Sequence, residues 1–405
     1  MIVTTLTIYS ASDIFMPAIA HMAADLGISE AQATSNYTFY YLVLMLSYAF
    51  LGPLCDSINQ RRILLCSVTA CLMGCVLSAS AQNMLMMNTG RSLQALATGL
   101  TMLTTQLWIA GFSDKSNMVS RLAWFTLITT LAPVLAPVLG GLITDHLSWR
   151  YSFWLIAAAS IVIIIILATT TRLGREREGE QPSPSTQQTP HIWHNYVSKT
   201  ARSYWWALRH SPLEGFSLTL QGLYMSQGVF ISVASFLFTR ELGISASSLG
   251  LLSSIIVAGF VVGRFPTMYL RKHHSVRTAY LFNASFVLLS GAALVVYYLI
   301  TGTHSATGVI AGLAVQAIGF SGMAILSLNN CLLTSGEAKG AVSGLYNFMN
   351  QGASLLGILL VQLFFAMGLS GMQIFQATLC LLLAIALLGT WLFLKTYPNY
   401  KDLIE

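Results

Sequence analysis

Long apolar stretches separated by short polar gaps dominate this chain of 405 residues. A helix needs about 20 mainly apolar residues to cross a bilayer, and with that window the pattern gives six stretches, a polar gap and six more. We expect them at residues 2–24, 34–55, 63–82, 84–110, 121–144, 150–170, 213–239, 248–269, 276–301, 306–333, 341–368 and 371–395. The pattern predicts an all-α integral membrane protein with twelve transmembrane helices in two pseudo-symmetric six-helix bundles.

Composition supports this interpretation and gives the helices a direction. The chain is 55% hydrophobic and only 8% charged, whereas soluble domains carry about 25% charged residues. The net charge of +6 does not indicate nucleic-acid binding, because the basic residues lie in short gaps and form no continuous patch. With the N-terminus inside, the cytoplasmic segments hold sixteen of the 20 lysines and arginines, so both termini are predicted to be cytoplasmic.

A polar gap divides the chain into its two halves. We expect an N-terminal bundle at 1–171, a cytoplasmic linker at 172–212, a C-terminal bundle at 213–396 and a cytoplasmic tail at 397–405. The end of the linker mixes aromatic and basic residues, which fits either a plain linker or an amphipathic helix on the inner leaflet.

The two halves share a short sequence at the same place. "DLGIS" (Asp25–Ser29) ends the first predicted span, and "ELGIS" (Glu241–Ser245) ends the seventh. Duplicated halves are a known transporter architecture in which the substrate site lies between the halves, near the middle of the membrane. We therefore expect a binding site between the two bundles.

One carboxylate lies deep in a predicted span. Asp13 is about 18 Å along the first helix at roughly 1.5 Å per residue, and none of the other acidic residues lies so deep. Burial opposes the ionisation of a carboxylate and a nearby cation favours it, so a group between these influences can exchange a proton. Asp13 is a candidate proton site and counter-ion for a cationic substrate; the alternative is a structural hydrogen bond to a neighbouring helix.

Other polar residues could belong to the same site. Arg91, in the fourth span, could tune Asp13 or lie on the proton path; alternatively, it reaches the membrane interface or binds backbone carbonyls. Polar residues in the spans could line a substrate pocket or simply connect helices; they are Tyr9, Ser12, Tyr37, Asn329 and Asn330. The six cysteines show no metal-ligand spacing, and no phosphate-binding Gly-x-x-x-x-Gly-Lys loop occurs. We therefore expect no metal, no cofactor and transport driven by an ion gradient.

Three motifs, in order along the chain, resemble those of a known family. "GPLCDSINQRRILL" (Gly52–Leu65) resembles the loop signature of the major facilitator superfamily, although Ser57 and Gln60 depart from it. "GRSLQALATG" (Gly90–Gly99) resembles the arginine-bearing signature of the fourth helix, with Ala95 in place of a glycine. "LAPVLAPVLGG" (Leu131–Gly141) resembles the antiporter signature, and its doubled Ala-Pro-x-Leu is typical of the bicyclomycin and chloramphenicol-resistance type of drug:proton antiporter.

The resemblance implies roles for the residues that match. Gly52, Asp56, Arg61 and Arg62 would clamp the inner ends of the helices in the outward-facing state. Conformational or gating roles are also implied at a second set of positions, where prolines and glycines would form a kinked seam that limits proton leakage: Gln94, Pro133, Pro137, Gly140 and Gly141.

The resemblance also implies a function, a location and partners. The chain is expected to be a proton-coupled exporter of small lipophilic or cationic compounds and not an enzyme. The alternative is a dedicated transporter of one metabolite, nucleoside or siderophore on the same fold. It would lie in the bacterial inner membrane as a monomer, with protons, lipid and a small-molecule substrate as partners. Members of this group usually have a longer charged leader before the first helix, so a truncated N-terminus is a further expectation.

Overall fold

The structure is a computed structural model that describes residues 2–51, 59–112, 133–169, 213–303, 305–333 and 339–399, and these residues are mainly helical. The first half contains α1 (Ile2–Asp13), η1 (Met16–Ala18), α2 (Ile19–Asp25), α3 (Glu30–Phe50), α5 (Gln60–Ala79), α6 (Met84–Phe112), a helix at 133–146 and α8 (Trp149–Thr169). The second half contains α11 (Leu213–Ser235), η2 (Phe236–Glu241), α12 (Ala246–His273), α13 (Val276–Thr301), α14 (Ala306–Leu333), α15 (Lys339–Ala366), α16 (Gly371–Thr396) and η3 (Tyr397–Asn399).

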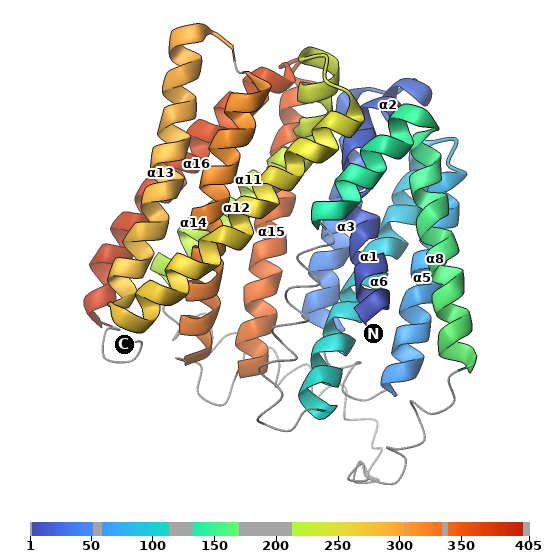
Figure 1. The fold of residues 1–405 in the computed structure, drawn as a ribbon, viewed down its shortest axis with the longest axis horizontal. Coiled ribbons are helices and arrows are strands. Elements are labelled where there is room, and N and C mark those ends of the chain that lie inside the picture. Colours follow the sequence, from blue (N-terminus) through green and yellow to red (C-terminus); the bar gives the residue numbers. More distant parts are fainter. Residues whose placement is uncertain are drawn as a thin grey trace.

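The helices form two groups that lie side by side. Figure 1 shows α1, α3, α5, α6 and α8 on one side and α11 to α16 on the other, with the start of α1 and the end of α16 toward the same end of the molecule. One cluster of buried apolar side chains is centred on the first group and includes residues of α11 and α15, and a second cluster is centred on the second group and includes Met16. The groups meet where α3 packs against α15 and where η1 packs against α11 and α12.

The outer surface of the molecule is apolar. Large hydrophobic side chains such as Leu139, Ile165, Leu289, Ile300 and Leu387 are exposed, which is the arrangement expected where lipid replaces water. In the part of the chain that the structure describes, eight helices are long and apolar enough to cross a membrane.

The two repeated segments have the same local structure. Gly27 and Gly243 both adopt positive φ angles, 63° and 66°, a conformation that glycine tolerates best. Two residues after each glycine comes a serine, Ser29 or Ser245. Its hydroxyl accepts a hydrogen bond from the third backbone N–H of the next helix. The sequence repeat therefore marks the same turn between the first and second helices of each half.

Several predicted boundaries were wrong. The first span is a broken helix, because Pro17 interrupts it. The second begins at Glu30 instead of 34, since a capping box between Ser29 and Gln32 starts the helix before the apolar run. The eighth extends to His273, because helical structure continues into polar residues beyond the apolar stretch. The linker at 172–212 and residues 121–132 of the fifth predicted span lie outside the described residues.

A candidate substrate site between the two helix groups

The break in the first span places Asp13 at the end of α1. Pro17 has no backbone N–H, so the carbonyl of Asp13 loses its usual helical donor, and the chain continues as the short helix η1. The Ser12 hydroxyl lies 3.0 Å from both an Asp13 carboxylate oxygen and the Tyr9 carbonyl oxygen. Helix α1 therefore ends at Asp13, and the Ser12 hydroxyl donates a hydrogen bond to the Asp13 carboxylate.

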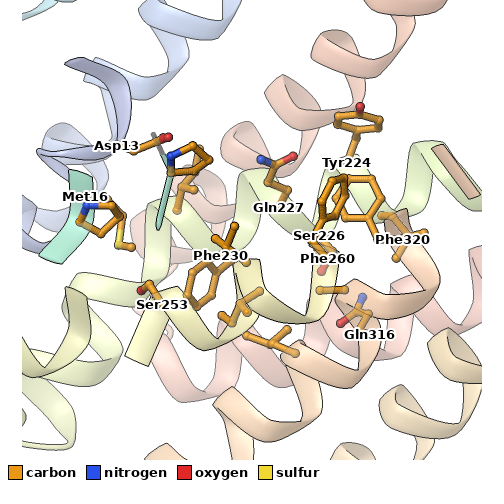
Figure 2. Close-up of a pocket in the computed structure, with 18 of the residues that line it drawn as sticks. Asp13, Met16, Tyr224, Ser226, Gln227, Phe230, Ser253, Phe260, Gln316 and Phe320 are labelled. Atoms are coloured by element: carbon orange, nitrogen blue, oxygen red, sulfur yellow. The ribbon is translucent and has the colours of Figure 1, made fainter. Parts of the chain in front are cut away.

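Asp13 lines a cavity of about 360 Å³ between the two groups, a size typical of small-molecule sites, which span about 300–1,000 Å³. Figure 2 shows Asp13 and Met16 at one end and a group of aromatic rings at the other. The first half contributes Tyr9, Asp13, Met16, Pro133 and Pro137. The second half contributes mostly apolar and aromatic residues, including Tyr224, Gln227, Phe230, Phe260, Gln316 and Phe320.

Arg91 lies fully buried in the first group. Its Nη1 donates to the carbonyl of Ala11 at 3.0 Å and to Gln94 Oε1 at 2.7 Å, so it connects α6 to α1 just before Asp13. Its guanidinium carbon lies 4.6 Å from the centroid of the Tyr40 ring, within cation–π range. Arg91 Nε and Nη2 have no hydrogen-bond partner in the described part of the chain.

The structure separates the predicted substrate residues into three groups. Tyr9 and Asp13 line the cavity, and Ser12 contacts Asp13 from the side. Tyr37 does not line the cavity: it is buried beside Arg91, with the guanidinium carbon 5.7 Å from its ring centroid. Asn329 and Asn330 belong to α14, but their side chains lie outside the described residues.

Two residues of the predicted inner clamp fall within the described chain. Arg61 donates to the carbonyl oxygens of Leu167 (2.6 Å) and Ala168 (3.3 Å), so it binds the C-terminal end of α8 within its own helix group. Arg62 is exposed. Gly52 and Asp56 lie outside the described residues, so the clamp itself stays a prediction.

The predicted proline–glycine seam lies at close backbone contacts, one within the first group and two between the groups. A Cβ atom at Gly140 would clash with the carbonyl of Ile14, and one at Gly141 would clash with the carbonyl of Ala246. Gly250 of α12 has the same relation to the carbonyl of Pro137. Glycines at these positions let backbones of α1, helix 133–146 and α12 touch. Gln94 donates to Ser78 at 3.2 Å and so connects α6 to α5.

Polar contacts between the groups close the cavity at the end where the repeated turns lie. The Ser235 hydroxyl of α11 donates to the carbonyl of Pro17 at 2.9 Å and accepts from the N–H of Ala20 at 3.1 Å. The Asp145 carboxylate accepts from the backbone N–H groups of Ala246 and Ser247 at the start of α12. Under the predicted orientation this end faces outward, and these contacts join the two groups there.

Two carboxylates at this end, beyond the apolar spans, are held in the ionised form. Partial burial of Asp145 opposes ionisation, but the hydrogen bonds from Ser247 and Ala246 together outweigh it and lower its pKa below the usual 3.8. A hydrogen bond from Arg150, followed by one from Trp149, lowers the pKa of Asp25. Asp145 bridges the two groups, whereas Asp25 binds only within the first.

Most of the cavity wall was not predicted from the sequence. Phe230, Phe260, Gln316 and Phe320 lie in apolar spans, where a cavity-facing side chain has the same sequence signal as a packed or lipid-facing one. An amide side chain in a membrane helix was the available clue, because polar side chains in spans are uncommon. Gln227 and Gln316 carried that signal. In the described residues, no group of His, Cys, Asp and Glu side chains could hold a metal ion.

Two bundles of membrane helices around a central cavity define a membrane transporter. The profile of the Major Facilitator Superfamily matches residues 1–358, and the chain belongs to that family. Its fold is therefore the major facilitator fold, with twelve transmembrane helices in two six-helix bundles.

Curated relatives are similar at low identity. The chain is 23% identical to the chloramphenicol resistance protein CraA of Acinetobacter baumannii over 364 residues, which cover 89% of this chain and 81% of that protein. It is 24% identical to multidrug resistance protein D of Escherichia coli over 153 residues (37% of this chain, 39% of that one). Similarity to the multidrug resistance protein MdtL of Escherichia coli is 27% over 149 residues (37% and 38%).

Solved structures support the fold alone. The peptide transporter POT in complex with sulfate superposes with a TM-score of 0.77 at 13% identity, covering 100% of this chain and 94% of that one. A bacterial homologue of the human lysosomal transporter Spinster, in an inward-facing and unoccupied conformation, gives 0.68 at 15% identity, covering 97% and 96%.

Proposed function

We propose that this transporter exports small lipophilic or cationic compounds in exchange for protons, with Asp13 as the exchanging group. The observation that carries the proposal is the composition of the cavity. Among the described residues, Asp13 is the one acidic side chain that lines it, and the wall opposite is largely apolar and aromatic. Such a wall accepts many apolar shapes, while one carboxylate can bind either a proton or a cationic group.

Exchange at Asp13 needs two conditions, and the contacts around it support both. The carboxylate must be reachable from the substrate, which its position in the cavity provides. It must also not be permanently neutralised by a cation. Arg91 Nη1 donates hydrogen bonds to the Ala11 carbonyl and to Gln94. In the described chain Arg91 forms no hydrogen bond to Asp13. Proton and substrate can then compete for one carboxylate, which couples their movements.

The energy available from a proton is sufficient for drug export. One elementary charge crossing 100 mV supplies about 2.3 kcal/mol, and each tenfold concentration gradient requires about 1.4 kcal/mol. One proton that enters in exchange for a neutral solute can therefore maintain a gradient of more than tenfold, whereas exchange for a monovalent cation moves no net charge and is driven by the pH difference alone. We propose that the two bundles rock about the cavity, as a monomer in the bacterial inner membrane with both termini in the cytoplasm.

The names of the similar proteins point in the same direction. CraA, multidrug resistance protein D and MdtL are named for resistance to chloramphenicol or to several drugs. Chloramphenicol and a cationic dye such as ethidium are therefore the first compounds to test on this chain.

The test compares wild type with Asp13→Asn in cells that lack their own drug pumps, at equal membrane levels. Wild type should protect against chloramphenicol and export ethidium, and Asp13→Asn should lose the proton-driven part of both. Asp25→Asn, which changes an acid outside the cavity, is the matched control and should behave as wild type. If Asp13→Asn and wild type export equally, a group other than Asp13 couples protons to export. Protection against no compound by wild type would favour a dedicated metabolite carrier instead.

A further inference from the structure

The wall of the cavity opposite Asp13 is a cluster of three aromatic rings. Phe320 of α14 lies edge to face against Tyr224 of α11, with ring centroids 5.0 Å apart, and against Phe260 of α12, at 5.4 Å. Each ring comes from a different helix of the second group, and all three line the cavity. Figure 2 shows this cluster at the far end from Asp13. Edge-to-face geometry is the arrangement that a further aromatic ring can extend.

A buried hydrogen-bond acceptor lies beside the rings. Gln316 precedes Phe320 by four residues on α14, so both lie on one face of that helix. Its side chain lines the cavity and is only 4% exposed, yet its Oε1 has no hydrogen-bond partner in the described chain. An acceptor that is buried without a donor is destabilising unless a ligand or water supplies one.

A positive charge lies behind one ring. The guanidinium carbon of Arg264 is 5.3 Å from the centroid of Phe260, so the ring already interacts with a cation. A second cation at this end of the cavity would be repelled by Arg264. The charged part of a substrate therefore belongs at the Asp13 end, and a neutral group belongs among the rings.

We propose that Tyr224, Phe260, Phe320 and Gln316 form an aryl subsite, which takes a neutral aromatic ring bearing a hydrogen-bond donor while the cationic end of the same substrate lies at Asp13. The proposal rests on the proposed function and adds to it a substrate class and a bound orientation. Phe320 selects for the ring, and Gln316 Oε1 selects for a phenol, amide or aniline donor on it.

The experiment uses three probes that differ only at the neutral end. Each carries a trimethylammonium group on a propyl chain, which ends in a para-hydroxyphenyl, a para-methoxyphenyl or a cyclohexyl group. Binding to the purified full-length protein in lipid nanodiscs is measured by calorimetry. Wild type should bind the aryl probes about threefold to tenfold more tightly than the cyclohexyl probe. It should bind the phenol about fivefold more tightly than its methyl ether.

Two variants separate the two parts of the subsite. Gln316→Met removes the acceptor at similar side-chain length, so it should abolish the preference for the phenol and keep the preference for a ring. Phe320→Leu should do the reverse. Matched controls are Gln376→Met on α16 and Phe282→Leu on α13, neither of which lines the cavity. Both controls should keep both preferences.

Each contrary outcome has one meaning. If wild type binds all three probes equally and Asp13→Asn weakens all of them, the aryl subsite is wrong and the proposed function stands. If wild type binds none of them, the aryl subsite is wrong, and the proposed function is decided by the export of chloramphenicol and ethidium. Equal affinity of wild type for the phenol and its ether overturns the role of Gln316 without relying on any variant. The role of Gln316 is also overturned if the Gln316→Met variant still binds the phenol more tightly than its methyl ether.

Discussion

The two halves of this transporter share a fold but differ in the chemistry they bring to the cavity. The first half contributes the carboxylate of Asp13, and behind it the fully buried Arg91, which is hydrogen-bonded to Ala11 and Gln94. The second half contributes three packed aromatic rings. One of its arginines, Arg264, lies over the ring of Phe260. Duplication has thus produced one half suited to charge and one suited to apolar shape.

The same contrast occurs at the repeated turns. Asp25 accepts hydrogen bonds from the side chains of Trp149 and Arg150 at the start of α8. Glu241, at the matching position, accepts from the backbone N–H groups of Gly371 and Met372 at the start of α16. Both acids stabilise the start of the last helix in their half, where the helix dipole favours negative charge. The acid at this position therefore stabilises a helix start in both halves, through side-chain donors in the first half and backbone donors in the second.

The largest effect is expected from the buried Arg91, compared with the half-buried Arg264. Arg91→Lys keeps the charge but loses the planar group that reaches Ala11 and Gln94 together, and each charge-assisted hydrogen bond is worth about 1.5–3 kcal/mol. Ethidium export should fall by at least about tenfold at equal membrane levels. Arg264→Lys keeps a cation near Phe260 and should reduce export much less. Equal losses in the two variants would contradict the division between the halves.

An intermediate effect is expected at the contact between the groups. Ser235→Ala removes the hydrogen bonds to Pro17 and Ala20, each worth about 1 kcal/mol net. The outward-closed form should lose up to about 2 kcal/mol relative to the outward-open form. Ser232→Ala is the matched control, because the Ser232 hydroxyl donates only within its own helix, to Gly228.

The measurement for this contact is a distance across the closed end. Spin labels at Leu147 and Leu251, which are exposed and lie in different groups, report whether that end is open. Ser235→Ala should increase the long-distance population by up to roughly thirtyfold, and Ser232→Ala should leave it unchanged. No change in Ser235→Ala would mean that packing at the glycines alone closes this end.

The smallest effect is expected from Asp145, and it depends on pH. Its pKa is lowered when it binds the start of α12, so the closed form gains stability from the ionised carboxylate. That gain is complete above the usual value of 3.8 and is lost as the pH falls through the lowered pKa. Asp145→Asn should remove this dependence and weaken closure by about 0.5–1 kcal/mol. The same spin-label pair, measured between pH 7 and pH 3 in roughly one-unit steps, checks it; a pH response that persists in Asp145→Asn belongs to another group.

The sequence was sufficient for the fold and for the charged part of the site. The hydropathy pattern gave helix positions because lipid-facing and packed residues are both apolar, and Asp13 was evident because an acidic side chain is rare at that depth in a span. The break at Pro17 was harder to place, since proline is tolerated in membrane helices when a neighbour satisfies the freed groups. The polar contact that holds the chain just after the break comes from Ser235, which donates to the Pro17 carbonyl and lies 218 residues away in the chain.

The aromatic wall could not be predicted for a different reason. Phe260 and Phe320 are apolar residues in apolar spans, and their type and spacing do not differ from those of residues that face lipid. The packing of α12 against α14 places them on the cavity wall. Tyr37 is the opposite case, because a tyrosine in a span suggested a pocket, and in the structure this side chain lies beside Arg91 and not on the cavity wall. Polar residues in spans identify candidates, and the partner helix decides which of them meet substrate.

The contact made by Ser235 bears on how this protein can evolve. Both of its bonds go to main-chain atoms, of Pro17 and Ala20, so the side chains that surround the break are free of that task. Met16, next to Pro17, lines the cavity. Under the proposed function, selection by a new compound can therefore change Met16 and the wall around it while the main-chain contacts of Ser235 that join the two groups are kept.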